Sequence, residues 1–326
     1  MLFRALARIA AVAGATTGFA TAGWSVPVHV KSVDSAKAQD AKKAGAPAYK
    51  SVWKMSLPAG TVRVAVADVT EDKKHRLLVL DGKGTLTINR LANAKDIIVL
   101  ENDGEIALGK DAAKFAVGHF VKGKPAMIAA PGGIYYRDGG KFSKKPTTDL
   151  DNLSGAVRFT DGTECLFTLD QVVNGGPPVS FAVDPTAEKP LSPGKEMPEP
   201  EQTSGVYGEI TVQLPPQMLE GSKFPDEMKQ GGVVRLQDIR NDKNLYAVIA
   251  WQAADGSYLV VLEGSDVFPQ GNPSAKPVWK SPNLAGKMLD IALGPNPRDP
   301  KQTGIFALYA NDAGDKKPVL EFFTLN

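Results

Sequence analysis

The stretch Asp68–Lys73, which reads DVTEDK, returns further along the chain as DIRNDK at Asp238–Lys243. Each copy follows a short apolar stretch and precedes a second one, and a turn with Asp-Gly and a further apolar stretch come next. Apolar runs of four to six residues are typical of β-strands and too short for most helices. The match therefore predicts a repeated unit built from several short strands.

A second pair of matching stretches supports the same repeat. Val52–Gly60 reads VWKMSLPAG and Val278–Gly286 reads VWKSPNLAG, and each lies just before a new unit. Weaker copies fill the chain between them, so that units start near residues 64, 116, 156, 233 and 289. Most spacings are roughly 40–55 residues, and the longer gap after residue 156 has room for one more unit and an insertion.

A small sheet repeated with this period is typical of a β-propeller, in which blades packed around an axis cover one another's faces. We therefore expect an all-β propeller of about six blades, with five or seven also compatible. A lone strand is expected at Tyr49–Leu57 and the last strand at Val319–Leu325. We expect the N-terminal strand to complete the last blade and close the ring. A pair of β-sandwiches is the competing fold, and it accounts less well for the matching units.

The first 48 residues differ in composition from the rest. Two arginines precede an Ala-rich apolar run, and Ala20–Ala22 has the small-x-small form of a cleavage site, so we expect residues 1–22 to be a signal peptide. The apolar run is too short to be a transmembrane segment. Residues 23–48 lack apolar periodicity and are expected to be a flexible leader before the propeller at 49–326. The sequence thus predicts a secreted or periplasmic protein.

Residues 184–230 interrupt the repeat as a Pro-rich, acidic insertion. Proline donates no ladder hydrogen bond, so Pro185–Thr203 is expected to be an exposed loop. Val206–Leu214 alternates apolar and polar residues and is expected to be a strand, and Pro216–Lys229 is either a short helix or an irregular excursion. Long loops on repeat scaffolds often carry function, although a tolerated insertion without a role is the alternative.

Parts of two units resemble a known repeat family. Ala65–Asp72 with Arg76–Gly82, and the strand–turn–Phe ending at Gly133–Phe142, are similar to the FG-GAP/VCBS repeats of integrin α-subunits and many bacterial exported proteins. The resemblance covers residues 49–326, is strong in two or three units, and implies a propeller more firmly than any activity. It also implies calcium loops between the first two strands of each unit, because the family often binds Ca²⁺ there.

The corresponding loops of this chain depart from the family's pattern. The residues Asp68–Asp72 are followed by Lys73 and Lys74, and the other good copy contains Arg240 and ends in Lys243. Positive side chains stand where further oxygen ligands are needed for a hard cation. We therefore expect degenerate loops with no metal and no cofactor, in which the aspartates hydrogen-bond to backbone N–H groups.

Charge and motifs restrict the function classes. The net charge is +2, but the basic residues concentrate before residue 51, so the propeller itself is slightly acidic. Because phosphate binding needs clustered Lys and Arg, nucleic acid is excluded as the main partner. Nucleophile-elbow, phosphate-loop and dinucleotide motifs are absent, and we predict no catalytic site.

Few residue types here carry chemistry. Cys165 is the sole cysteine, so no intrachain disulfide forms, and its apolar neighbours predict a buried, inert thiol. The histidines are His29 in the leader, His75 in a loop and His119 at the repeat position of Asp68. A His-based metal site needs several converging ligands, so we predict a structural hydrogen bond for His119 rather than catalysis or metal binding.

Aromatic residues suggest a carbohydrate-binding alternative. Trp53, Trp251 and Trp279 could stack on sugars, but Trp53 and Trp279 share a repeat position, which favours packing between blades. Strand side chains alternate between faces, so Tyr135-Tyr136 is expected to place one ring inside and one outside, and Tyr207 is another exposed candidate.

We expect an exported, non-enzymatic binding or scaffolding module whose partner is a protein or an envelope component, with no binding residue identified. The alternative is a lectin-like propeller with a glycan ligand, which a glycan array would distinguish. A polysaccharide hydrolase or lyase with an unrecognised carboxylate pair is the third hypothesis, and turnover lost with one Asp or Glu change would identify it.

Overall fold

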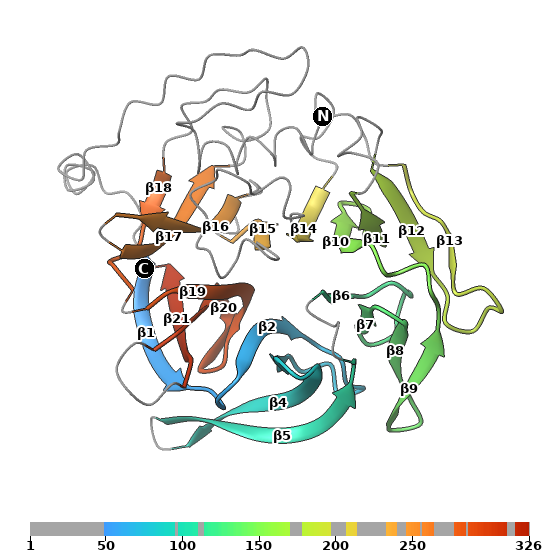
Figure 1. The fold of residues 1–326 in the computed structure, drawn as a ribbon, viewed down its shortest axis with the longest axis horizontal. Helices are drawn as coiled ribbons and strands as arrows, with labels where there is room; N and C mark the ends of the chain where they lie inside the picture. Colours follow the sequence, from blue (N-terminus) through green and yellow to red (C-terminus); the bar gives the residue numbers. More distant parts are fainter. Residues whose placement is uncertain are drawn as a thin grey trace, which may run out of the picture.

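A computed structural model describes residues 49–94, 97–109, 114–169, 178–196, 207–213, 233–239, 246–254, 256–263, 277–284, 286–311 and 317–325. The regular secondary structure of these residues consists entirely of β-strands. Figure 1 shows the sheets that they form arranged around a central axis. The described residues form a β-propeller of five blades, at the lower end of the expected range.

Three blades are separate four-stranded antiparallel sheets. Blade 1 consists of β2 (Thr61–Ala67), β3 (Arg76–Asp81), β4 (Thr85–Ala94) and β5 (Ile97–Ala107). Blade 2 consists of β6 (Ala116–Gly118), β7 (Met127–Ala130), β8 (Gly133–Asp138) and β9 (Lys141–Pro146). Blade 5 consists of β19 (Met288–Asn296), β20 (Asp299–Tyr309), β21 (Val319–Leu325) and β1 (Tyr49–Ser56).

The other two blades belong to one nine-stranded sheet. Blade 3 consists of β10 (Leu153–Phe159), β11 (Glu164–Thr168), β12 (Val179–Val183) and β13 (Leu191–Pro193). Blade 4 consists of β15 (Val233–Gln237), β16 (Tyr246–Ala253), β17 (Gly256–Glu263) and β18 (Pro277–Lys280). Between them, β14 (Tyr207–Gln213) pairs antiparallel with β10 on one side and β15 on the other, and so joins the inner edges of two blades (Figure 1).

The inner strands lie where the repeats predict them. β2, β6, β10, β15 and β19 begin or run through the five expected unit starts. Within the described residues, the long gap after residue 156 holds the rest of blade 3 and β14 and no further blade.

The segment interpreted as an insertion is partly propeller. The strand predicted at Val206–Leu214 is confirmed as β14, but the expected loop at Pro185–Thr203 contains β13, which pairs with β12. A strand ending in proline is tolerated there because β13 lies at the sheet edge and needs no donor on its outer side. Residues 1–48 and Pro216–Lys229 lie outside the described residues.

The N-terminal strand closes the ring, as the leftover strand predicts. β1 pairs antiparallel with β21, from Tyr49 opposite Leu325 to Ser56 opposite Val319. Trp53 of β1 is buried and stacks on Phe322 at 5.4 Å between ring centroids. The buried carboxylate of Glu321 accepts a hydrogen bond from the Tyr309 hydroxyl at 2.9 Å and pairs with Lys54 at 3.1 Å.

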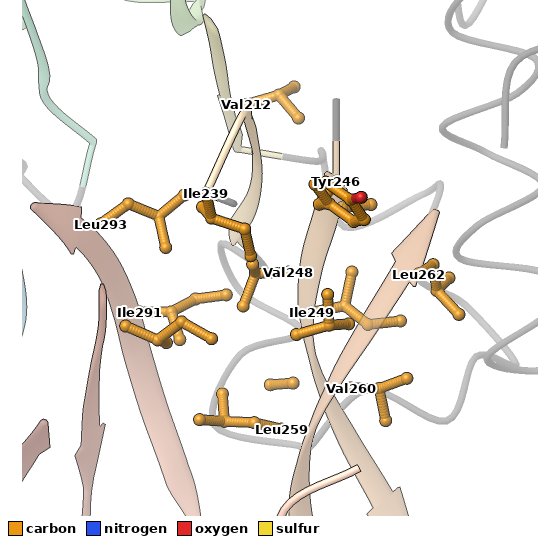
Figure 2. Packing of buried hydrophobic residues seen from close by; sticks show 14 of the residues in the cluster. Val212, Ile239, Tyr246, Val248, Ile249, Leu259, Val260, Leu262, Ile291 and Leu293 are labelled. Atoms are coloured by element: carbon orange, nitrogen blue, oxygen red, sulfur yellow. The ribbon is translucent and has the colours of Figure 1, made fainter. Parts of the chain in front are cut away.

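The hydrophobic core lies mainly between neighbouring blades, because the apolar face of each sheet covers the next. Figure 2 shows Ile291 and Leu293 of β19 beside Val248 of β16 in the largest of these clusters. Val212 of β14 belongs to the same cluster, so β14 is anchored by apolar packing as well as by its ladders. Among the described residues, no helix is long and apolar enough to cross a membrane.

Candidate functional site

A cavity of about 320 Å³ opens where the inner strands end near the axis. Wedge-shaped blades diverge from their axis, so the ends of the inner strands enclose space that no single blade can fill. All five blades and β14 contribute to its wall, through residues that include Asp68, His119, Arg158, Glu209, Gln237 and Gly294. This axial cavity is the candidate functional site.

His119 links three blades at the axial cavity. It follows β6 as Asp68 follows β2, and its Nε2 lies 3.0 Å from Asp68 Oδ1. Its Nδ1 lies 3.2 Å from the carbonyl oxygen of Lys124, and its backbone N–H donates to Glu164 Oε2. Both ring nitrogens therefore lie within hydrogen-bonding distance of oxygen atoms. The structural hydrogen bond predicted for His119 is confirmed.

Glu164, at the start of β11, is held close to the backbone of blade 2. Burial raises the pKa of its carboxyl, and the hydrogen bond from His119 and the charge of Arg158 oppose that rise. A Cβ added at Gly118 would lie 2.7 Å from Glu164 Oε2 and 2.7 Å from the Phe120 ring. Glycine at position 118 is thus what allows the carboxylate to approach this closely.

β14 brings two polar side chains to the cavity. Glu209 and Thr211 line it, whereas Ile210 and Val212 are buried in the core, as expected for side chains that alternate between faces. Glu209 Oε2 pairs with Arg158 Nη2 of β10 at 2.5 Å. Sequence reasoning predicted the strand but missed Glu209 as a site residue. The alternation of apolar and polar residues already indicated that the Glu209 side chain faces away from the core, and this pattern could have identified it.

A second group of charges lies further along the same inner strands. Asp290 of β19 is buried and accepts hydrogen bonds from the backbone N–H groups of Val64 and Ile291, each at 2.9 Å. Burial raises the pKa of Asp290, and the charges of Arg63 and Arg235 oppose the rise. Burial lowers the pKa of both guanidinium groups. These three side chains join the inner strands of blades 1, 4 and 5.

The loop that resembles a calcium loop is satisfied by protein groups. Asp72 accepts hydrogen bonds from Thr70 Oγ1 at 2.6 Å, from the Lys74 backbone at 3.0 Å and from Arg76 Nη2 at 2.8 Å. These bonds, that of Arg76 above all, hold the pKa of Asp72 well below its usual range. The positive charge that balances the Asp72 carboxylate comes from Arg76, not from Lys73 or Lys74.

The described residues contain no other candidate metal site. No group of three or more His, Cys, Asp or Glu side chains among the described residues is arranged to hold a metal ion. Residues 240–245 of the second loop lie outside the described part. The absence of metal and cofactor therefore stays a prediction.

The other candidate residues of the sequence have structural positions. Cys165 is buried, and burial raises the pKa of its thiol, as expected for an inert cysteine. Trp53 is buried, and Trp279 contacts Tyr49 at 5.1 Å and Phe323 at 5.8 Å between ring centroids. Both tryptophans serve the core between blades.

The remaining candidates divide between core, cavity and undescribed segments. Trp251 packs against the main core cluster, Tyr135 is buried and Tyr136 is half-buried. His75 lines the cavity, where partial desolvation lowers its pKa. His29 lies outside the described residues, and so does the side chain of Tyr207.

Comparisons with known proteins find distantly similar solved structures and no family. No family model matches the sequence, and no curated protein matches it. One similar solved structure is BBS1N in complex with ARL6DN, with 11% identity and a TM-score of 0.36 over 85% of this chain and 97% of that chain. Another is Chaetomium thermophilum Sqt1 bound to the N-terminus of the ribosomal protein L10, with 11% identity and a TM-score of 0.32 over 77% of this chain and 70% of that chain.

Proposed function

We propose that this protein is an exported, non-enzymatic propeller that binds a protein or cell-envelope component at its axial cavity. The observation that carries the proposal is the polar wall of that cavity, to which every blade and the inserted strand β14 contribute. A concave site with a few converging polar groups is the usual form of a ligand-binding site.

Binding is favoured over catalysis by the chemistry of the wall. The described lining residues include no serine, cysteine or lysine that could act as a nucleophile. Asp68 and Glu164 are both engaged with His119, and Glu209 is paired with Arg158. Groups fixed in this way provide a preformed polar surface, whereas an acid–base pair needs a free lone pair or proton directed at the substrate.

Export and family belong to the same proposal. The expected signal peptide at residues 1–22 supports secretion or a periplasmic location, and the DVTEDK-type units support descent from FG-GAP/VCBS repeats with degenerate calcium loops. Intact-mass measurement of the protein from the non-cytoplasmic fraction tests export, with a mature chain beginning at Gly23 as the expected result. A full-length chain found only in the cytoplasm would refute it.

Site-specific photocrosslinking in cells that make the protein tests the binding site. A crosslinking amino acid at Thr303, which lines the cavity, is expected to capture a discrete protein or envelope component. The matched control places the same group at Lys141, which is exposed on β9 away from the axis. Equal capture from both positions, or none from Thr303, would contradict binding at the axial cavity.

A further inference from the structure

We propose that the axial cavity binds the basic side chain, Lys or Arg, of a protein partner. This inference rests on the proposed function and adds the chemical class of the ligand. It depends on three features of the cavity, namely its charge, an unpartnered acceptor and its size.

The described lining residues carry more negative than positive charge. The carboxylates are Asp68, Glu164 and Glu209, and the only permanent cation among these lining residues is Arg158. The three carboxylates come from blade 1, blade 3 and β14, so their convergence is a property of the ring. Carboxylates that share one concave, partly desolvated site attract a cation more strongly than they would on an open surface.

The wall also holds a hydrogen-bond acceptor without a donor. Gln237 lines the cavity at the end of β15, and its Oε1 is buried with no hydrogen-bond partner among the described residues. A buried polar atom that lacks a partner costs free energy, and a ligand that supplies the donor recovers it. An ammonium or guanidinium group supplies several N–H donors and no acceptor, which matches a wall of carboxylates and a side-chain carbonyl.

Size and access agree with a single side chain. At about 320 Å³ the cavity is at the small end of the range for ligand pockets. The Arg158–Glu209 pair is 40% and 35% exposed, so an incoming cation can exchange with Arg158 as the partner of Glu209. Partly exposed ion pairs of this kind contribute little free energy, so the exchange costs little.

The proposal predicts weaker binding at acidic pH. Glu164 faces His119 from the β6–β7 loop, Arg158 from β10 and Glu209 from β14. Burial raises the pKa of Glu164, so this carboxylate loses its charge at a higher pH than an ordinary glutamate does. Loss of that charge reduces the attraction for a cation, so affinity is expected to fall as the pH is lowered.

Calorimetric titration of the whole propeller with short capped peptides tests the inference. An Ac-Gly-Arg-Gly-NH₂ peptide is expected to bind. The peptide with citrulline in place of arginine has the same shape without the charge, and it should bind at least about tenfold more weakly. Glu209→Gln and Glu164→Gln are each expected to lower affinity about five- to tenfold. Gln237→Leu should lower affinity without lowering the melting temperature, because the lost acceptor has no partner.

The controls separate this inference from the proposed function. Glu188→Gln removes the same charge from the exposed outer loop of blade 3 and should change affinity less than about twofold. Equal binding of the citrulline peptide, or tighter binding of an Ac-Gly-Glu-Gly-NH₂ peptide, would overturn the cationic assignment. Tighter binding of spermidine would overturn the assignment to a protein side chain. A partner crosslinked at Thr303 would still support the proposed function in each case.

Discussion

At the scale of single residues, His119 and Glu164 show how a propeller concentrates polar groups at its axis. Both have partners from neighbouring blades, because His119 of blade 2 contacts Asp68 of blade 1 and Glu164 of blade 3. Residues at the same position in successive repeats therefore become spatial neighbours once the ring has closed. Asp68 and His119 are an example, because they occupy the same repeat position in blades 1 and 2 and their side chains contact each other.

Replacing Glu164 by glutamine should flatten the pH dependence of stability. The raised pKa means that the folded state binds this proton more tightly than the unfolded state does. Its contribution is therefore greatest below about pH 4.3 and is lost as pH rises through the folded-state pKa. The variant keeps an acceptor for the His119 N–H, so melting scans at pH 4–8 should show no loss at pH 7. A lower melting temperature at pH 7 would show that the charge itself stabilises the fold.

The Asp72 loop predicts insensitivity to chelators. Arg76 and two other donors already satisfy the carboxylate that a calcium ion would need. Adding EDTA should leave the melting temperature unchanged, because removing a ligand destabilises only a protein that binds it. The measurement is differential scanning fluorimetry with and without EDTA, with calcium added back as the control. A fall of about 2 °C or more, reversed by calcium, would identify an occupied site.

At the scale of elements, β14 is the unusual part of the molecule. It lies between two inner strands, and its approach to β10 depends on Gly155, where an added Cβ would lie 2.0 Å from the carbonyl oxygen of Thr211. Its alternating pattern made the strand predictable. Its place could not be predicted, because the pairings of Glu209 with Arg158 and with Gln237 join segments far apart in sequence. β13 was missed because its proline, Pro193, is compatible only with an edge strand, and the sequence does not show which strand lies at an edge.

Gly155→Ala should displace β14 from β10. The clash involves backbone atoms and cannot be relieved by a side-chain rotation, so we expect a loss of about 1–3 kcal/mol in the free energy of unfolding. Urea denaturation measures that loss, and the arginine peptide should bind more weakly because Glu209 moves. Gly82→Ala is the matched control, since its Cβ would meet only an ordinary contact at 3.7 Å. Equal stability of the two variants would show that the close approach of β14 to β10 at Gly155 does not stabilise the fold.

At the scale of the whole molecule, the ring is closed by side chains from both ends of the described chain. Trp53 contacts Phe306 at 5.8 Å and Phe322 at 5.4 Å, and its indole Nε1 is buried without a hydrogen-bond partner among the described residues. The repeat made this closure predictable from the sequence. The strand before the first unit has no partner there, and the last unit lacks its outer strand, so the two are expected to pair.

Trp53→Ala should therefore destabilise the whole propeller and not one blade. Loss of a buried aromatic costs about 3–5 kcal/mol, whereas Trp53→Phe should cost clearly less because no indole hydrogen bond is lost. Denaturation followed by both fluorescence and circular dichroism measures the effect, and the two transitions should stay coincident. A separate early transition in the Ala variant would show that blade 5 opens independently of the ring.

The pairing of β1 with β21 also imposes an order on biogenesis. β1 precedes the four strands of blade 1 and all later blades in the chain, but its hydrogen-bonding partner β21 follows all of them. At about 5–20 residues per second, this strand and its exposed tryptophan wait for tens of seconds without a sheet. During that interval the nascent chain presents an unpaired apolar strand edge, which makes it a substrate for holding chaperones.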